Sequence, residues 1–146
     1  MSSSAGEPRR VKKQVESDVN SLFLVLGGVS LLVGAIGIAN VTLVSVLERV
    51  GEIGLRRALG AARRHIAAQF LAESTVMGLI GGVIGASIGT LVVVIVSASR
   101  QWTPVLDGWV PFVAPLLGAA VGLVAGIYPS LRAAGLEPVD ALRSGT

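Results

Sequence analysis

The sequence predicts an all-α membrane protein with three transmembrane helices, an N-terminal helical extension and a short helix between the first two spans. Apolar residues make up 52% of the chain, charged residues only 14%, and the mean hydropathy is +0.76, which excludes an ordinary soluble domain. Each of three charge-free runs exceeds the roughly 20 residues that cross a hydrocarbon core about 30 Å thick. These runs cover residues 21–47, 74–99 and 108–131. Because backbone in lipid must close its own hydrogen bonds and ten-residue alternating strands are absent, the spans are helices.

The N-terminal part predicts a stalk that continues into the first span. Residues 1–8 have no apolar period and are expected to be disordered. Over residues 9–21 an apolar residue recurs every fourth position between charged ones, which predicts an amphipathic helix entering the span at 22–47. A cleavable signal peptide is the competing interpretation, but the uncharged run is longer than its usual apolar region. The recurring residues are Val11, Val15, Val19 and Phe23.

The remaining elements form, with the first span, one membrane domain over residues 9–146. Residues 48–60 contain good helix formers and many charges, and Gly60 followed by Ala61 offers a stop, so a short helix at the membrane surface is expected. A further helix begins near Ala62 and contains the span at 74–99. The third span, 112–131, is expected to end near Pro129, followed by a tail over 132–146 with a short helix that has Pro138 in its first turn.

Glycines four residues apart predict that the second and third spans pack on each other. Helices associate in lipid through close van der Waals contact, which small residues permit because the backbones can approach. A dinucleotide-binding loop is the alternative, but no strand precedes these glycines. The predicted packing residues are Gly78, Gly82, Gly85, Gly89, Gly118, Gly122 and Gly126.

The order of several short motifs closely resembles the FtsX-like, MacB-type permeases of ABC transporters. The string at residues 40–61 contains Glu-Arg-Val-Gly-Glu-Ile-Gly-Leu-Arg-Arg-Ala-Leu-Gly-Ala, and 69–73 reads Gln-Phe-Leu-Ala-Glu. A glycine-rich span follows, and Tyr-Pro-Ser-Leu-Arg-Ala-Ala at 128–134 precedes Glu-Pro-Val-Asp-Ala-Leu-Arg at 137–143. The resemblance implies a dimeric permease with four transmembrane helices, an extracytoplasmic domain after the first of them, and cytoplasmic ATPase subunits or domains. The chain resembles the C-terminal three-helix half, beginning in the stalk.

The same resemblance implies that residues 48–60 are the coupling helix that docks on the ATPase. Arg56 and Arg57 suit pairing with acidic groups, while Ile53 and Leu55 suit an apolar cleft. The alternative is a positively charged interfacial loop with internal pairs such as Glu52 with Arg56. The predicted partner-binding residues are Glu48, Arg49, Glu52, Ile53, Leu55, Arg56, Arg57 and Gly60.

Catalytic and metal-binding chemistry is not expected in this chain. It has no phosphate-binding Gly-x-x-x-x-Gly-Lys-Ser/Thr loop, and His65 is the single histidine, so no catalytic residue, metal site or cofactor is predicted and ATP hydrolysis is assigned to a partner. Glu73 and Arg132 both fall near the predicted inner membrane edge, where ionisable groups are often paired, and a Glu73–Arg132 ion pair is a hypothesis.

Together with the three predicted spans, the resemblance implies a permease subunit or half-subunit in a bacterial inner membrane, whose membrane helices and stalk move when a partner ATPase hydrolyses ATP. Expected partners are that ATPase, membrane lipid, and a second permease copy or a separately encoded N-terminal half, whereas nucleic acid is not expected. The alternatives are a scaffold or regulator that recruits an ATPase without transport, and a truncated inactive permease. Seven basic residues on the side of the 48–60 helix, against five on the other, favour a cytoplasmic C-terminus and an extracytoplasmic N-terminus.

Overall fold

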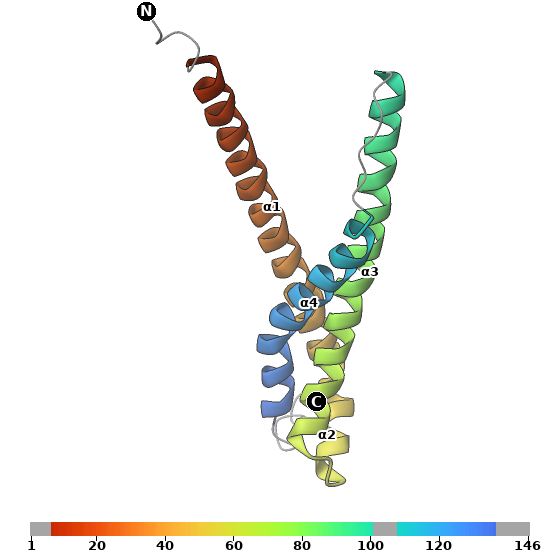
Figure 1. Cartoon of the computed structure of the whole chain (residues 1–146). Helices are drawn as coiled ribbons and strands as arrows, with labels where there is room; N and C mark the ends of the chain where they lie inside the picture. Colours follow the sequence, from red (N-terminus) through yellow and green to blue (C-terminus); the bar gives the residue numbers. More distant parts are fainter. Residues whose placement is uncertain (1–6, 101–107, 137–146) are drawn as a thin grey trace, which may run out of the picture. The chain divides into compact units, whose positions relative to one another are not determined.

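Four helices make up the computed structural model, which describes residues 7–100 and 108–136 (Figure 1). No strand occurs in these ranges, and three of the helices, α1, α3 and α4, are long and apolar enough to cross a membrane. The all-α class and the three long apolar helices expected from the sequence are therefore confirmed. The helices are α1 (Glu7–Glu48), α2 (Val50–Ala58), α3 (Arg63–Ser99) and α4 (Val110–Gly135).

The first helix, α1, is continuous over 42 residues. At 1.5 Å per residue it is about 63 Å long, roughly twice the thickness of a hydrocarbon core. It already includes Glu7 and Pro8, which the sequence placed in a disordered segment, and proline is well tolerated in the first turn of a helix. The excess length agrees with an extension beyond the bilayer, and the stalk itself stays a prediction.

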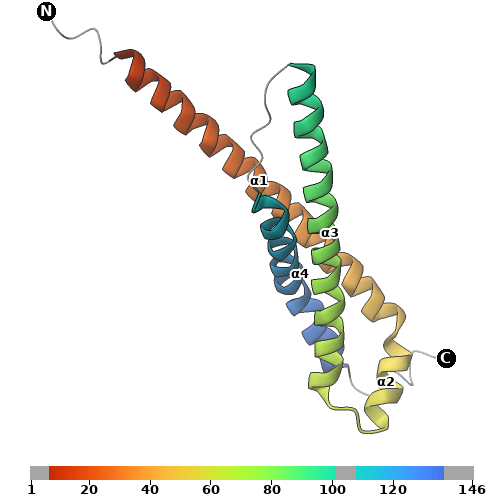
Figure 2. The same ribbon diagram turned by 45° about the vertical axis from the view of Figure 1, so that its right-hand side comes forward.

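Helices α3 and α4 pack against each other through glycines, and Figures 1 and 2 both show them side by side. Gly78 of α3 lies against the backbone of Gly118 and Gly122, so a β-carbon added at Gly78 would collide with it. At Gly82 an added β-carbon would lie only 2.6 Å from the Ala114 carbonyl oxygen. Such contact between backbones is available only without side chains, which is the physical basis of the predicted small-residue face.

The other predicted packing glycines divide into two groups. Gly126 lies against the Ser74 side chain of α3, whereas Gly85 and Gly89 have open space where a side chain would stand. The structure therefore brings five of the seven predicted packing glycines into the α3–α4 contact. Those five are Gly78, Gly82, Gly118, Gly122 and Gly126.

A small apolar core lies where the last part of α1, α2 and the facing ends of α3 and α4 meet. Ile66 and Phe70 are four residues apart on α3 and therefore share a face, and they are 4% and 2% exposed. Val46 of α1, Ile53 of α2 and Ala133 of α4 pack with them. This core holds α2 against the long helices.

Helix α4 extends past Pro129 to Gly135, beyond the end that the sequence predicted. A proline removes one backbone donor but does not stop a helix whose following residues are held by packing. Ser130, Ala133 and Ala134 are all buried, and they keep the last turns of α4 on the core. The short helix predicted around Pro138 lies outside the described residues.

Candidate functional site

The segment between α1 and α3 folds as a short helix, α2, with a tight turn at its end. Only Arg49 separates α1 from α2, so the chain turns within one residue. At the other end Gly60 has a φ of 96°, which a glycine adopts without strain. The Ala61 amide donates to the Arg56 carbonyl at 2.9 Å, and the Gly60 amide donates to the Arg57 carbonyl at 3.1 Å. This pair of bonds is a Schellman motif, and it stops α2 where the sequence placed a stop.

Two opposite faces of α2 have different surroundings. Ile53 and Gly54 are buried on the inner face, and Ile53 belongs to the apolar core. Leu55 on the outer face is 61% exposed, and Leu59, the residue directly after α2, is 81% exposed. Glu48, Glu52 and Arg56 are also exposed, so the same segment presents both charged and apolar side chains to its surroundings. Of the two apolar side chains expected to reach a partner, Leu55 is accessible, whereas Ile53 instead anchors the helix.

Polar side chains connect α2, and Arg49 directly before it, to α3. Arg56 pairs with Glu52 on its own helix and donates from Nη1 to Oε1 of Gln69 at 3.0 Å. Gln69 then donates from Nε2 to Oε1 of Glu73 at 3.2 Å, and the same oxygen lies 3.6 Å from Nη1 of Arg49. We call these five residues, Arg49, Glu52, Arg56, Gln69 and Glu73, the polar chain. Its directional hydrogen bonds favour one position of α2 along α3.

The energy of the polar chain is limited by its exposure. The Arg49 and Glu73 side chains are 48% and 34% exposed, and those of Arg56 and Glu52 are 50% and 52% exposed. Exposed ion pairs contribute at most about 1 kcal/mol. The apolar core therefore holds α2 in place, and the polar chain sets its position along the core.

Three other titratable residues considered in the sequence, Arg132, Arg57 and His65, do not belong to the polar chain. The structure places Glu73 beside Arg49 and Gln69, while Arg132 is exposed and makes no ion pair with Glu73. Arg57 is half-buried and donates from Nη1 to the Ala61 carbonyl at 3.4 Å, which ties it to the turn after α2. His65 is exposed, and no group of three potential metal ligands occurs within the described part of the chain.

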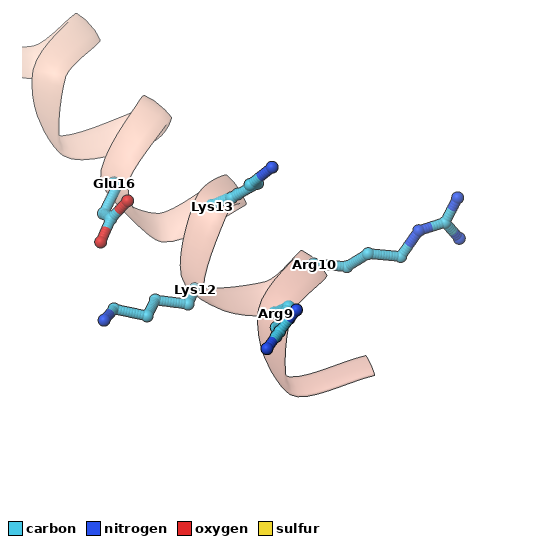
Figure 3. A pocket seen from close by; sticks show the side chains of 5 residues that line it. All are labelled: Arg9, Arg10, Lys12, Lys13 and Glu16. Atoms are coloured by element: carbon cyan, nitrogen blue, oxygen red, sulfur yellow. The ribbon is translucent and has the colours of Figure 1, made fainter. Parts of the chain in front are cut away.

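A second cluster of charged residues lies at the start of α1. Arg9, Arg10, Lys12, Lys13 and Glu16 border a shallow hollow there. Figure 3 shows their side chains spreading away from the helix in different directions rather than converging on one point. All five are exposed, so this cluster is a solvated helix surface rather than a built site.

Sequence reasoning missed the residues of α3 that receive α2. Gln69 is the centre of the polar chain, and Ile66 and Phe70 belong to the apolar core that contains Ile53. The signal for them was present, because two apolar and two polar residues each recur at a spacing of four in residues 66–73. That spacing predicts two adjacent stripes on one helix, although not which element covers them.

Comparison with known proteins adds the family context of this arrangement. Residues 24–138 match the family described as FtsX-like permease C-terminal. The chain is 47% identical over 137 residues to the macrolide export ATP-binding/permease protein MacB of Rhodopirellula baltica, which covers 94% of this chain and 20% of that protein. It is 45% identical over 118 residues to the ABC transporter permease YknZ of Bacillus subtilis, covering 81% of this chain and 30% of that protein.

A third relative is similar to the chain to about the same degree. The MacB protein of Bdellovibrio bacteriovorus is 42% identical over 125 residues, which is 86% of this chain and 19% of that protein. The chain thus spans about a fifth to a third of the length of these relatives. Residues 24–138 of the chain are the part that matches the permease family.

Proposed function

The chain belongs to the FtsX-like permease family of ABC transporters, and from this membership we propose that it transmits movement from a cytoplasmic ABC-type ATPase to membrane helices. In this proposal α2 is the coupling helix. The ATPase binds its outer face, and ATP hydrolysis takes place on that partner rather than on this chain. The apolar helices and the bacterial relatives point to an inner membrane as the site of action.

The observation that carries the proposal is the two-faced environment of α2. Leu55 on the nine-residue α2 and Leu59 directly after it are exposed, whereas Ile53 and Gly54 on the opposite face of α2 are buried. Exposed leucines among charged residues, at the polar end of membrane helices, suit an apolar contact bordered by ion pairs, the usual composition of a protein interface. Arg56 contributes both to this surface and to the polar chain, so a partner that displaces α2 also pulls on α3.

We further propose that the stalk at the start of α1 receives this movement outside the membrane, and that a second permease copy or a separately encoded half completes the transporter. The end of α1 shares the core with α2 through Val46, and α1 is one continuous helix. A displacement at α2 therefore has a helical path toward the other membrane surface. This route gives α2 a mechanical role that needs no catalytic residue in the chain.

The test is the affinity of the ATPase that copurifies with the chain. Replacing Leu55 and Leu59 together with glutamate removes two apolar contacts and adds two charges, while the buried face of α2 is untouched. Burial of one leucine contributes about 1.5–3 kcal/mol, so the Kd for the ATPase is expected to rise at least about tenfold. Binding is measured with the purified partner on nanodiscs that contain the full chain.

A matched control makes the same chemical change at the other end of the chain. Val11 and Val15 of α1 are 61% and 55% exposed, and their double replacement by glutamate is expected to leave the Kd for the ATPase unchanged. Equal affinity for the Leu55/Leu59 variant and the unaltered chain would show that the outer face of α2 does not bind the ATPase.

A further inference from the structure

A groove separate from the polar chain lies between the start of α3 and the end of α4. Its volume is about 300 Å³ and it is open to the surroundings. Both helices contribute to its lining, which combines positive charge with small and apolar residues: Arg63, Arg64, Ala67, Leu131, Ala134 and Gly135. A groove of this composition, at the end of two membrane helices, has both a charged and an apolar part.

The charge of the groove has one sign. Arg63 and Arg64 are both exposed, and no carboxylate belongs to the groove lining. Among residues 9–100 and 108–136, the ion pairs involve Arg49 and Arg56 instead. The two guanidinium groups thus present adjacent donors suited to the oxygens of a phosphate, which arginine binds in a bidentate manner.

The depth of the groove places it at the membrane surface. Leu131 ends the charge-free run of α4 and is 63% exposed. Ser74 contacts Gly126 in the antiparallel pair, and the same pairing continued along both helices sets Leu131 level with about residue 69 of α3. Arg64 is then about five residues, or roughly 8 Å, beyond the level at which the charge-free run of α4 ends, near the headgroup layer of a bilayer.

We propose that this groove binds an anionic phospholipid of the leaflet next to α2. The headgroup phosphate lies between Arg63 and Arg64, and an acyl chain follows Ala67 and Leu131 toward the hydrocarbon core. Basic pockets between transmembrane helices are suited to anionic headgroups, and the small side chains of Ala67 and Ala134 leave room for the chain. This site requires only that α3 and α4 cross the membrane, so it does not depend on ATPase coupling.

Native mass spectrometry of the full chain in detergent tests the site. Phosphatidylglycerol and phosphatidylcholine with the same acyl chains are titrated separately, and the Kd of the first bound lipid is compared. A basic residue near an anionic headgroup strengthens binding about fivefold, so two predict an overall preference of about 30-fold for phosphatidylglycerol. The R63Q/R64Q double variant is expected to lose this preference, and R63K/R64K is expected to retain most of it.

Two controls separate the groove from general electrostatics and from free anions. The R9Q/R10Q variant removes the same charge from the start of α1 and is expected to keep the preference. Glycerol 3-phosphate, which has the headgroup phosphate without acyl chains, is expected not to compete at the lipid concentrations used. An equal loss in R9Q/R10Q, equal binding of both lipids by the unaltered chain, or competition by glycerol 3-phosphate would each overturn the proposal.

Discussion

Single glycines decide how closely α3 and α4 approach. Gly78 and Gly118 face each other so closely that each would direct an added β-carbon at the carbonyl oxygen of the other. In lipid, where apolar side chains gain nothing by leaving the solvent, this contact between backbones is the main attraction available between the two helices. The close packing of α3 on α4 therefore depends on the absence of a β-carbon at each of these positions.

Replacing Gly78 with alanine is expected to destabilise the α3–α4 pair. The new methyl group meets backbone atoms that cannot rotate away, and overpacking of this kind typically costs about 1–3 kcal/mol. The midpoint of thermal unfolding in detergent should fall. Gly81 is the matched control, because it is on the same helix with open space where a side chain would stand, and its replacement by alanine should not lower the midpoint. Equal midpoints for the two variants would contradict the close contact.

At the scale of elements, α2 is held by two kinds of contact with different roles. The core around Ile53 and Phe70 is apolar and almost fully buried, so it resists separation of α2 from α3 but specifies position only loosely. The polar chain is half exposed and weak, but its hydrogen bonds are directional. If α2 is the coupling helix that we propose, this division allows it to shift along α3 at low cost without detaching from the core.

A double-mutant cycle distinguishes the pair in the structure from the pair suggested by the sequence. Replacing Arg49 and Glu73 with glutamine, singly and together, is expected to give a coupling energy of about 0.5 kcal/mol, since both side chains are partly exposed. The same cycle with Arg132 and Glu73 should give additive losses within error. Unfolding free energies in detergent provide both values. A larger coupling for Arg132 than for Arg49 would contradict the arrangement of the polar chain.

The sequence predicted the elements better than their contacts, for a physical reason. Charge-free length alone locates a membrane helix, because the bilayer sets one requirement for all spans. Contacts depend on which faces meet, and a period of four shows that Ile66 and Phe70 share a face without showing that Ile53 covers it. For the same reason the sequence suggested Arg132 as the partner of Glu73 from depth alone, while the structure brings Arg49 to it. Helix α4 passed Pro129 because packing of Ala133 and Ala134 outweighed one lost hydrogen bond.

At the scale of the whole molecule, an odd number of spans determines which parts share a side of the membrane. If α1, α3 and α4 each cross once, the start of α1 and Arg100 lie on one side, and α2 and the end of α4 lie on the other. The groove, the polar chain and the exposed leucines then all belong to the side of α2. We propose that this side is cytoplasmic, as docking of an ATPase there requires.

Cysteine labelling tests this arrangement directly, because the sequence contains no cysteine. Single replacements at Lys13, Gly51 and Arg100 place a thiol in exposed positions of α1, α2 and the end of α3. A membrane-impermeant maleimide applied to intact cells is expected to label the Lys13 and Arg100 variants, and to label the Gly51 variant only after permeabilisation. Labelling under denaturing conditions normalises each signal.

The pattern of failure would identify which step is wrong. Labelling of the Gly51 variant alone in intact cells would show that the orientation is the opposite of the one proposed. It would contradict docking of a cytoplasmic ATPase on α2, whereas the lipid groove would then lie in the outer leaflet. Labelling of Lys13 without Arg100 would mean that α1 or α3 does not cross, which would contradict the three-span arrangement on which the depth of the groove depends. In the chain, α2 lies between α1 and α3. If the Lys13 and Arg100 variants are labelled in intact cells and the Gly51 variant is not, both α1 and α3 must cross the membrane.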